Sequence, residues 1–179
     1  TFRQINSRLQ GHPDMKKTSG VDFSSGSLGQ GLSVGCGIAW GLKNSGKSSR
    51  VYVLLGDGEL NEGQVWEAAM SAAKFKLDNI VAIIDHNGVQ LDGTTDEIMP
   101  LGSIADKFKS FGWDVTQIAG HDFADIGKAL DLRTERPLAI VAKTVKGKGV
   151  SFMENNHKWH GMPIDDKQYI LAVNEINKD

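Results

Sequence analysis

The fold of this chain is decided by residues 51–89, which read VYVLLGDGELNEGQVWEAAMSAAKFKLDNIVAIIDHNGV. Two apolar runs, 51–55 and 80–84, have the length and β-branched content of buried strands, and the segment from Glu62 to Lys76 between them has the pattern of a helix. A crossover of this kind is almost always right-handed and joins strands that run in the same direction. The stretch therefore predicts a βαβ unit in a parallel sheet.

Polar residues follow both predicted strands: Asp57 lies between two glycines after the first, and Asn87 follows the second. Open α/β sheets bind ligands outside the carboxyl ends of their strands, and neighbouring strands lie about 4.8 Å apart. A carboxylate and an amide oxygen at that separation can share one Mg²⁺, which is usually held by one or two protein groups together with phosphate oxygens. We therefore expect Asp57, the Asn87 side chain and the Val89 carbonyl to hold magnesium that carries a diphosphate.

Two acidic residues have plainer alternatives. Asp57 could simply cap the helix that follows, although a cap needs neither of the flanking glycines. Glu62 lies near the start of that helix, as does Glu67, where acidic side chains are favoured by the helix dipole alone.

The rest of the chain continues the alternation of strands and helices. We expect residues 2–9 to finish a helix, and Gly31, Gly35 and Gly37 to let the first long helix pack closely against another backbone. The pattern predicts one α/β domain, residues 1–179, with a mostly parallel sheet and helices on both faces. The further predicted helices are 27–42, 104–111, 122–132 and 165–176; the further strands are 113–118 and 138–142; residues 90–102 and 146–163 are predicted as irregular.

Composition narrows the class of protein. The 20 basic and 22 acidic residues give a formal charge of −2, which argues against a general nucleic-acid or anionic-membrane surface. No apolar run approaches the roughly 20 residues that a membrane span needs. The single cysteine, Cys36, is expected to pack inertly and fits a reducing compartment such as the cytoplasm. The chain opens at Thr1 in what reads as mid-helix, so we expect a fragment, or a subunit whose first part lies outside this sequence.

Four ordered segments resemble one family. The run GDGELNEGQVWEAAMSAAKFKLDNIVAIIDHNGVQLDG (56–93) resembles the thiamine-diphosphate motif of transketolases. FRQINSRLQGHPD (2–14), GSLGQG (26–31), and KT (143–144) with HKWHGMP (157–163) are similar to the family's other segments in order and type. The chain thus resembles the N-terminal, diphosphate-binding part of transketolase, or the separate small subunit of a split enzyme.

The resemblance implies thiamine diphosphate and Mg²⁺ as cofactors. Asp57, Asn87 and the Val89 carbonyl match the family's magnesium ligands, and Ser27 stands where the family has proline. The positions that match the family's cofactor contacts are Gly26, Ser27, Leu28, Gly58, Asn87 and His160.

The resemblance also implies catalytic roles. His160 matches a histidine that reaches the cofactor and the donor substrate, and its ordinary pKa suits proton transfer. Glu62 matches an acid that joins a carboxylate network across the dimer, with Glu67 as a second member. The alternative for His160 is a solvated loop residue, and the role of His157 stays open. Asn6 stands where the family usually has a histidine; it can hydrogen-bond a substrate hydroxyl but cannot shuttle a proton, so we expect a donor preference different from that of ordinary transketolase.

The implied reaction is transfer of a two-carbon ketol unit between sugar phosphates, as in the pentose phosphate pathway. The family's activating glutamate lies in a pyrimidine-binding domain that no segment here matches, so we expect a partner chain or domain and a two-fold symmetric hetero-oligomer. The alternatives are deoxyxylulose-phosphate synthase, the α-subunit of a 2-oxo acid dehydrogenase, or a non-catalytic phosphate-binding subunit. Against the last, no Gly-x-Gly-x-x-Gly follows the first strand.

Overall fold

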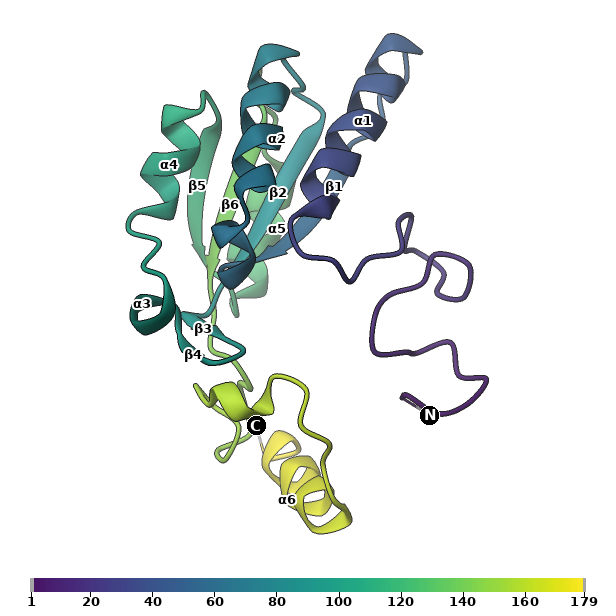
Figure 1. Cartoon of the computed structure of the whole chain (residues 1–179), viewed down its shortest axis with the longest axis vertical. Helices are drawn as coiled ribbons and strands as arrows, with labels where there is room; N and C mark the ends of the chain where they lie inside the picture. Colours follow the sequence, from purple (N-terminus) through teal and green to yellow (C-terminus); the bar gives the residue numbers. More distant parts are fainter. Residues whose placement is uncertain (1, 179) are drawn as a thin grey trace.

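The computed structural model describes residues 2–178 and contains a twisted sheet with helices on both of its faces (Figure 1). The strand order is β1-β2-β6-β5, and every neighbouring pair is parallel. The predicted fold class is confirmed. The strands of the sheet are β1 (Val51–Gly56), β2 (Ile80–His86), β5 (Asp114–Ala119) and β6 (Leu138–Lys143), and a separate antiparallel pair is formed by β3 (Val89–Gln90) and β4 (Gly93–Thr94).

The helices divide unequally between the two faces. In Figure 1, α1, α2 and α4 lie in front of the sheet and α5 lies behind it, while α6 stands apart below the strands. The front face holds the larger core, which includes residues from all three of its helices. The helices are α1 (Gln30–Asn44), α2 (Gly63–Lys74), α3 (Thr95–Ile98), α4 (Ile104–Ser110), α5 (Phe123–Asp131) and α6 (Asp166–Ile176), with short 3-10 helices at Gly58–Asn61 and His157–Trp159.

The two central strands explain why the apolar runs decide the fold. Residues 80–82 of β2 and 138–142 of β6 are buried without interruption, because helices cover both sides of these strands. Under the front helices, Phe108 packs edge-on against Trp113 with ring centroids 5.3 Å apart. The Trp113 indole N–H donates to the Ala69 carbonyl at 2.9 Å, which satisfies its one polar atom inside the core.

Three stretches of the chain depart from the predicted secondary structure, each for a local reason. Residues 2–9 form turns rather than a helix, and Arg3 and Asn6 have positive φ values of 59° and 66°. Helix α1 starts at Gln30 rather than residue 27, because Gly29 takes the left-handed conformation, with φ 79°. The predicted loop 90–102 contains β4 and helix α3, which Thr94 and Glu97 hold through a capping box.

The single cysteine is packed as predicted. Cys36 is buried in α1, and burial raises the pKa of its thiol to about 11. Of the residues that the structure describes, none belongs to a helix with the length and apolar character of a membrane span.

Two glycines of α1, Gly31 and Gly35, lie against a side chain rather than against another backbone. A Cβ at Gly35 would lie 2.6 Å from Val53 Cγ2 in β1, and one at Gly31 would lie 3.6 Å from Val53 Cγ1. A Cβ at Gly37 would meet nothing within 4 Å. The expectation of close packing against another backbone is therefore wrong: Gly35 packs closely, but against a strand side chain, and Gly37 has no close neighbour.

Gly35 and Gly37 provide a matched test of the packing of α1. Gly35→Ala is expected to lower the free energy of unfolding by about 1–2 kcal/mol, because the overpacking strain against Val53 exceeds the gain in helix propensity. Gly37→Ala is expected to raise it by up to about 1 kcal/mol, because the new methyl group faces open space. Urea unfolding of both variants measures the difference, and equal effects would contradict this packing.

Candidate functional site

The loops after β1 and β2 meet at the carboxyl edge of the sheet. Gly56 pairs with Asp85 in the parallel register, and the Asp57 N–H donates to the Asp85 carbonyl at 3.3 Å. Asp57 and Asn87 therefore leave neighbouring strands at the same edge, as the βαβ unit predicts.

The Asp57 carboxylate joins these two loops. The residue is only 1% exposed. Its Oδ1 accepts a hydrogen bond from the Gly58 N–H at 2.9 Å, and its Oδ2 accepts one from the Gly88 N–H at 2.6 Å. The first bond caps the short 3-10 helix that starts at Gly58, so the capping interpretation holds for one oxygen. The second bond crosses to the other loop, which a cap alone does not require.

The electrostatics of Asp57 favour a cation beside it. Burial raises the pKa of this carboxyl above its ordinary value, and the hydrogen bonds from Gly88 and Gly58 offset that effect only in part. A buried carboxylate that two N–H donors do not fully compensate is stabilised in its charged form by a nearby positive charge.

The residues on either side of Gly88 offer oxygen donors of the kind that magnesium accepts. Residues 2–178 contain no group of three or more His, Cys, Asp or Glu that could hold a metal. An ion at Asp57 would therefore depend on neutral oxygens such as the Asn87 amide and the Val89 carbonyl, which are ligands that Mg²⁺ accepts. The Asn87 Oδ1 already accepts the Val89 N–H at 3.0 Å, and this bond fixes the side chain within its loop.

A cavity of about 1110 Å³ opens beside this edge. The loop before α1, the end of β1 and the long segment after β6 contribute to its wall. Four of the predicted cofactor contacts come together here although they are far apart in sequence. These four are Gly26, Ser27, Leu28 and His160, and they share the wall with Arg3, His12, Glu59 and Lys146.

Glu59 is a site residue that sequence reasoning missed. Its Oε1 accepts the Gly29 N–H at 2.7 Å and its Oε2 accepts the Gly56 N–H at 3.1 Å. One carboxylate thus joins the loop before α1 to the end of β1 at the cavity wall. In the sequence, Glu59 looks like an ordinary acid in a first helical turn, and only the tertiary fold brings Gly29 to it.

His12 lies against the glycine that begins the GSLGQG segment. A Cβ at Gly26 would lie 3.1 Å from His12 Cγ, so any larger residue would displace the imidazole ring. The absence of a side chain at Gly26 therefore lets the N-terminal loop close over this side of the cavity.

On the opposite wall, Lys146 Nζ lies 3.5 Å from His160 Nδ1. An ammonium group has only donors, so Nδ1 serves as the acceptor and the neutral ring carries its proton on Nε2. Partial burial and, to a lesser degree, the charge of Lys146 lower the pKa of His160 below its ordinary value.

Other predicted residues lie outside this cavity. Asn87 lines a second cavity on the α5 side of the sheet, and Asp57, Gly58 and Val89 line neither. Glu62 is exposed at the start of α2 and makes no capping bond with its side chain.

Glu67 lines a groove between α1 and α2, together with Trp40 and Phe75. Neither Asn6 nor His157 lines the large cavity.

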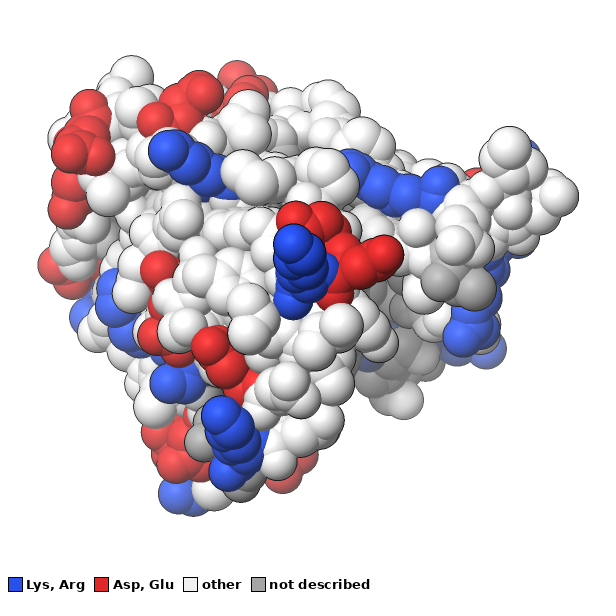
Figure 2. Space-filling model, turned by 90° about the horizontal axis from the view of Figure 1, so that it is seen from below, with Lys and Arg blue, Asp and Glu red and all other residues white. Residues whose placement is uncertain are grey.

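The face around these loops carries charges of both signs. Figure 2 views the molecule from below, the side where the loops after the strands lie in Figure 1, and shows basic and acidic side chains interspersed among uncharged ones.

A parallel α/β sheet with a buried aspartate and a glycine-lined cavity at its carboxyl edge is the architecture of a cofactor-binding domain. The chain belongs to the transketolase family: the family model described as "Transketolase, thiamine diphosphate binding domain" matches residues 1–176. The predicted family is confirmed.

Relatives of two kinds support the assignment. The chain is 43% identical to one subunit of the apulose-4-phosphate transketolase of Phocaeicola vulgatus, over 99% of this chain and 64% of that protein. It is 39% identical to 6-deoxy-6-sulfo-D-fructose transketolase subunit SqwG of Clostridium sp., over 100% of this chain and 66% of that protein. It is 41% identical to human transketolase, over 98% of this chain and 28% of that protein.

Solved structures agree with this assignment. Transketolase from Campylobacter jejuni superposes with a TM-score of 0.90 at 33% identity, over 98% of this chain and 29% of that one. The present chain therefore spans slightly less than two thirds of the separate subunits and under a third of the single-chain enzymes.

The lysine beside His160 gives a test of the electrostatics. Lys146→Met is expected to raise the pKa of His160, because the variant removes a neighbouring positive charge while the burial of the ring remains. Titration of the imidazole signals by NMR measures the change. Lys148→Met is the control, because Lys148 pairs with Glu154 at 3.8 Å and does not line the cavity. An unchanged His160 pKa in Lys146→Met would show that the two groups do not interact.

Proposed function

We propose that this chain is the diphosphate-binding part of a transketolase that depends on thiamine diphosphate and Mg²⁺ and transfers a two-carbon ketol unit between sugar phosphates. The observation that supports this most directly is the buried Asp57 carboxylate. It joins the two strand-end loops through Gly58 and Gly88, next to a cavity large enough for a cofactor. The family assignment supports the identity of that cofactor.

The site residues would bind the metal, contact the diphosphate and exclude water. Asp57, the Asn87 amide and the Val89 carbonyl would hold the metal, and the Gly58 and Asn87 backbone would face the diphosphate. When bound, thiamine diphosphate supplies the nucleophile and the electron sink for breaking a carbon–carbon bond. Gly26, Ser27 and Leu28 would form the wall that excludes water from it.

His160 is the proposed proton-transfer group. With Nδ1 directed at Lys146, the Nε2–H is free to donate to a substrate hydroxyl. A pKa lowered by burial and by the lysine keeps the ring neutral near pH 7, so Nε2–H donates a hydrogen bond to a substrate oxygen, and the ring takes up a proton only at the nitrogen that carries no hydrogen.

We also propose that the chain works with a pyrimidine-binding partner, in a hetero-oligomer with two-fold symmetry. Two relatives are named as subunits, and human transketolase is more than three times the length of the matched region. Glu62, which is exposed, would join a carboxylate network with the partner. The single buried cysteine suits the cytoplasm, where such an enzyme would serve pentose phosphate metabolism.

The substrate class follows from charge. Arg3 and Lys146 line the large cavity, with Glu59 as its one acidic residue. A surplus of cationic groups suits a sugar with an anionic end, which is the kind of substrate in the names of both subunit relatives. Assays of ketose phosphates against pyruvate test this, since consumption of pyruvate would favour deoxyxylulose-phosphate synthase or a 2-oxo acid dehydrogenase.

Cofactor binding can be measured on the chain itself. Asp57→Asn keeps the size of the side chain but removes its charge, so magnesium-dependent binding of thiamine diphosphate is expected to weaken by at least about tenfold, or about 1.4 kcal/mol. Titration calorimetry with thiamine diphosphate, with and without Mg²⁺, measures the loss, and NAD and ATP serve as competing ligands.

Asp106→Asn is the matched control, because Asp106 is a largely exposed acid on α4. It is expected to bind thiamine diphosphate as the unsubstituted chain does. Retained magnesium-dependent binding in Asp57→Asn would remove Asp57 from the metal site, and preference for NAD or ATP would favour a regulatory phosphate-binding subunit.

Turnover should require the partner. The chain alone is expected to transfer no two-carbon units, whereas the chain with a pyrimidine-binding subunit should do so. In that assembly His160→Ala is expected to lower kcat by roughly 100-fold, within the range for loss of a general acid–base group. Unchanged kcat would return His160 to the role of a solvated loop residue, and turnover by the isolated chain would contradict the need for a partner.

A further inference from the structure

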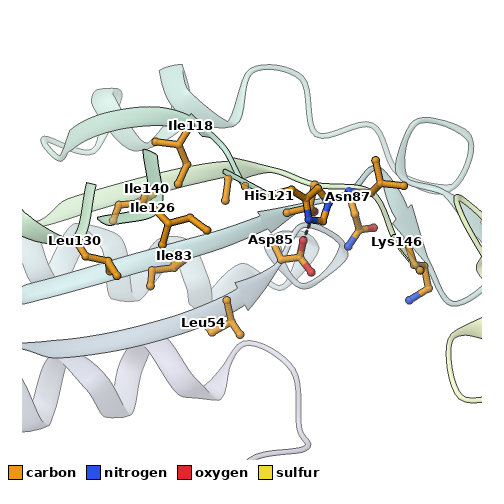
Figure 3. A pocket seen from close by; sticks show the side chains of 15 residues that line it. Leu54, Ile83, Asp85, Asn87, Ile118, His121, Ile126, Leu130, Ile140 and Lys146 are labelled. Atoms are coloured by element: carbon orange, nitrogen blue, oxygen red, sulfur yellow. Dashed lines mark hydrogen bonds between the residues drawn. The ribbon is translucent and has the colours of Figure 1, made fainter. Parts of the chain in front are cut away.

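Two leucines in the wall of the large cavity are held in place in different ways. Leu54 is 72% exposed and Leu28 is 57% exposed, so burial among apolar neighbours fixes neither side chain. The position of Leu54 is fixed by its strand, because β1 pairs with β2 and sets Leu54 beside Ile83 (Figure 3). Leu28 lies in the turn before α1, outside the helices and strands of the described chain. Its position therefore depends on the polar contacts of that turn.

The peptide unit that joins Leu28 to Gly29 is held at both of its ends. Its N–H, which belongs to Gly29, donates to Glu59 Oε1 at 2.7 Å. Its carbonyl, which belongs to Leu28, accepts a longer bond from Gln64 Nε2 at 3.4 Å. The C=O and N–H groups of a trans peptide point in opposite directions, so bonds at both ends fix the orientation of the peptide plane. The backbone beside Leu28 is thus fixed although the side chain is exposed.

The same turn rests directly on the start of α2. A Cβ at Gly29 would lie 2.8 Å from Glu62 Cβ and 3.0 Å from Gln64 Cγ. Gly29 also has a φ of 79°, a conformation that favours glycine. The missing side chain at Gly29 therefore lets the turn approach α2 closely enough for its N–H to reach Glu59.

The other oxygen of Glu59 connects this turn to the proposed metal site. Glu59 Oε2 accepts the Gly56 N–H at 3.1 Å, and Gly56 immediately precedes Asp57. The N–H groups of Val51 and Asp57 donate toward β2, and successive N–H groups of a strand point in opposite directions. The Gly56 N–H accordingly points to the outer edge of β1, where Glu59 accepts it. One carboxylate therefore joins the residue before Asp57 to the residue after Leu28.

We infer that Glu59 is a positioning residue for the ligand of the large cavity. It holds the backbone of Leu28 at the cavity wall in a fixed position relative to Asp57, and Gln64 completes the hold on the peptide after Leu28. That the ligand is thiamine diphosphate rests on the proposed function. The hold on Leu28 does not, because it follows from the contacts of Glu59 alone.

The role requires both oxygens of a carboxylate, because two N–H donors converge on the Glu59 side chain. A glutamine has one carbonyl oxygen and an NH2 group that only donates, so Glu59→Gln leaves one N–H facing a donor. The alternative is that Glu59 serves only the dipole of the short 3-10 helix in whose first turn it lies. That alternative predicts no effect of Glu59 on Gly29 or on Leu28.

Amide hydrogen exchange of the chain without ligand tests the hold on the turn. Glu59→Ala is expected to speed exchange of the Gly29 amide by at least about tenfold, because the bond to the carboxylate is lost. The Trp113 amide, which donates to the Phe108 carbonyl at 3.1 Å, should keep its rate and so report an intact core. Glu135→Ala, at an exposed acid between α5 and β6, is the matched control and should leave both rates unchanged. An unchanged Gly29 rate in Glu59→Ala overturns the inference.

A double-mutant cycle on ligand binding tests whether Glu59 acts through Leu28. Glu59→Gln and Leu28→Ala are each expected to weaken magnesium-dependent binding of thiamine diphosphate by about tenfold. Combined in one chain, they should weaken it by clearly less than the product of about 100-fold, because a leucine that is absent cannot be misplaced. Titration calorimetry on the four chains measures the coupling. Losses that multiply to the full product show that Glu59 does not act through Leu28 and overturn the inference.

The two experiments separate this inference from the proposed function. If the unsubstituted chain does not bind thiamine diphosphate, the proposed function is contradicted, and the exchange rate of the Gly29 amide still decides whether Glu59 holds the turn. If the unsubstituted chain binds thiamine diphosphate and Glu59→Gln binds it equally tightly, the proposed function stands and the inference is wrong.

Discussion

The hydrogen bond from the Gly88 N–H to the Asp57 carboxylate is the contact on which the candidate site depends. It joins the end of β1 to the end of β2 at 2.6 Å, at a residue that is almost completely buried. Without it, the two loops would share only the backbone hydrogen bonds of their strand ends, such as that from the Asp57 N–H to the Asp85 carbonyl. Glu59, two residues after Asp57, likewise joins two backbone segments, because its carboxylate accepts hydrogen bonds from the Gly29 and Gly56 N–H groups. Two carboxylates thus organise three backbone segments at one edge of the sheet.

The molecule has a rigid frame, and loops form most of the wall of the large cavity beside it. The frame is the sheet with α1, α2 and α4, where aromatic packing around Phe108 and Trp113 fixes the strands. The wall comes from the N-terminal loop and from the segment after β6, which carry His12 and His160. In the proposed function, the frame would hold the diphosphate and the loops would face the substrate. This agrees with a family whose members are named for different sugars.

The sequence was a good guide wherever periodicity and chain direction decide the outcome. The runs 51–55 and 80–84 became neighbouring parallel strands, and the helix predicted over 122–132 forms as α5, which Asp122 caps through the Ala124 N–H. Prediction failed where a single backbone conformation or a long-range contact determines where an element begins or which residues line the site. Gly29 moved the start of α1, and residues 2–9 turned out to form turns. Glu59 could not be singled out, because its partner Gly29 is distant in sequence and close only after folding.

The strand order has a consequence for how the chain is made. β6 is the last strand of the sheet in sequence, yet it lies between β2 and β5, which precede it. Until residue 143 has left the ribosome, β2 and β5 have no common neighbour, and their apolar edges stay unpaired. Vectorial synthesis therefore produces one strand pair, β1 with β2, and an unpaired strand β5, which only the late central strand can unite. The nascent chain is most prone to aggregation just before its cofactor site can exist.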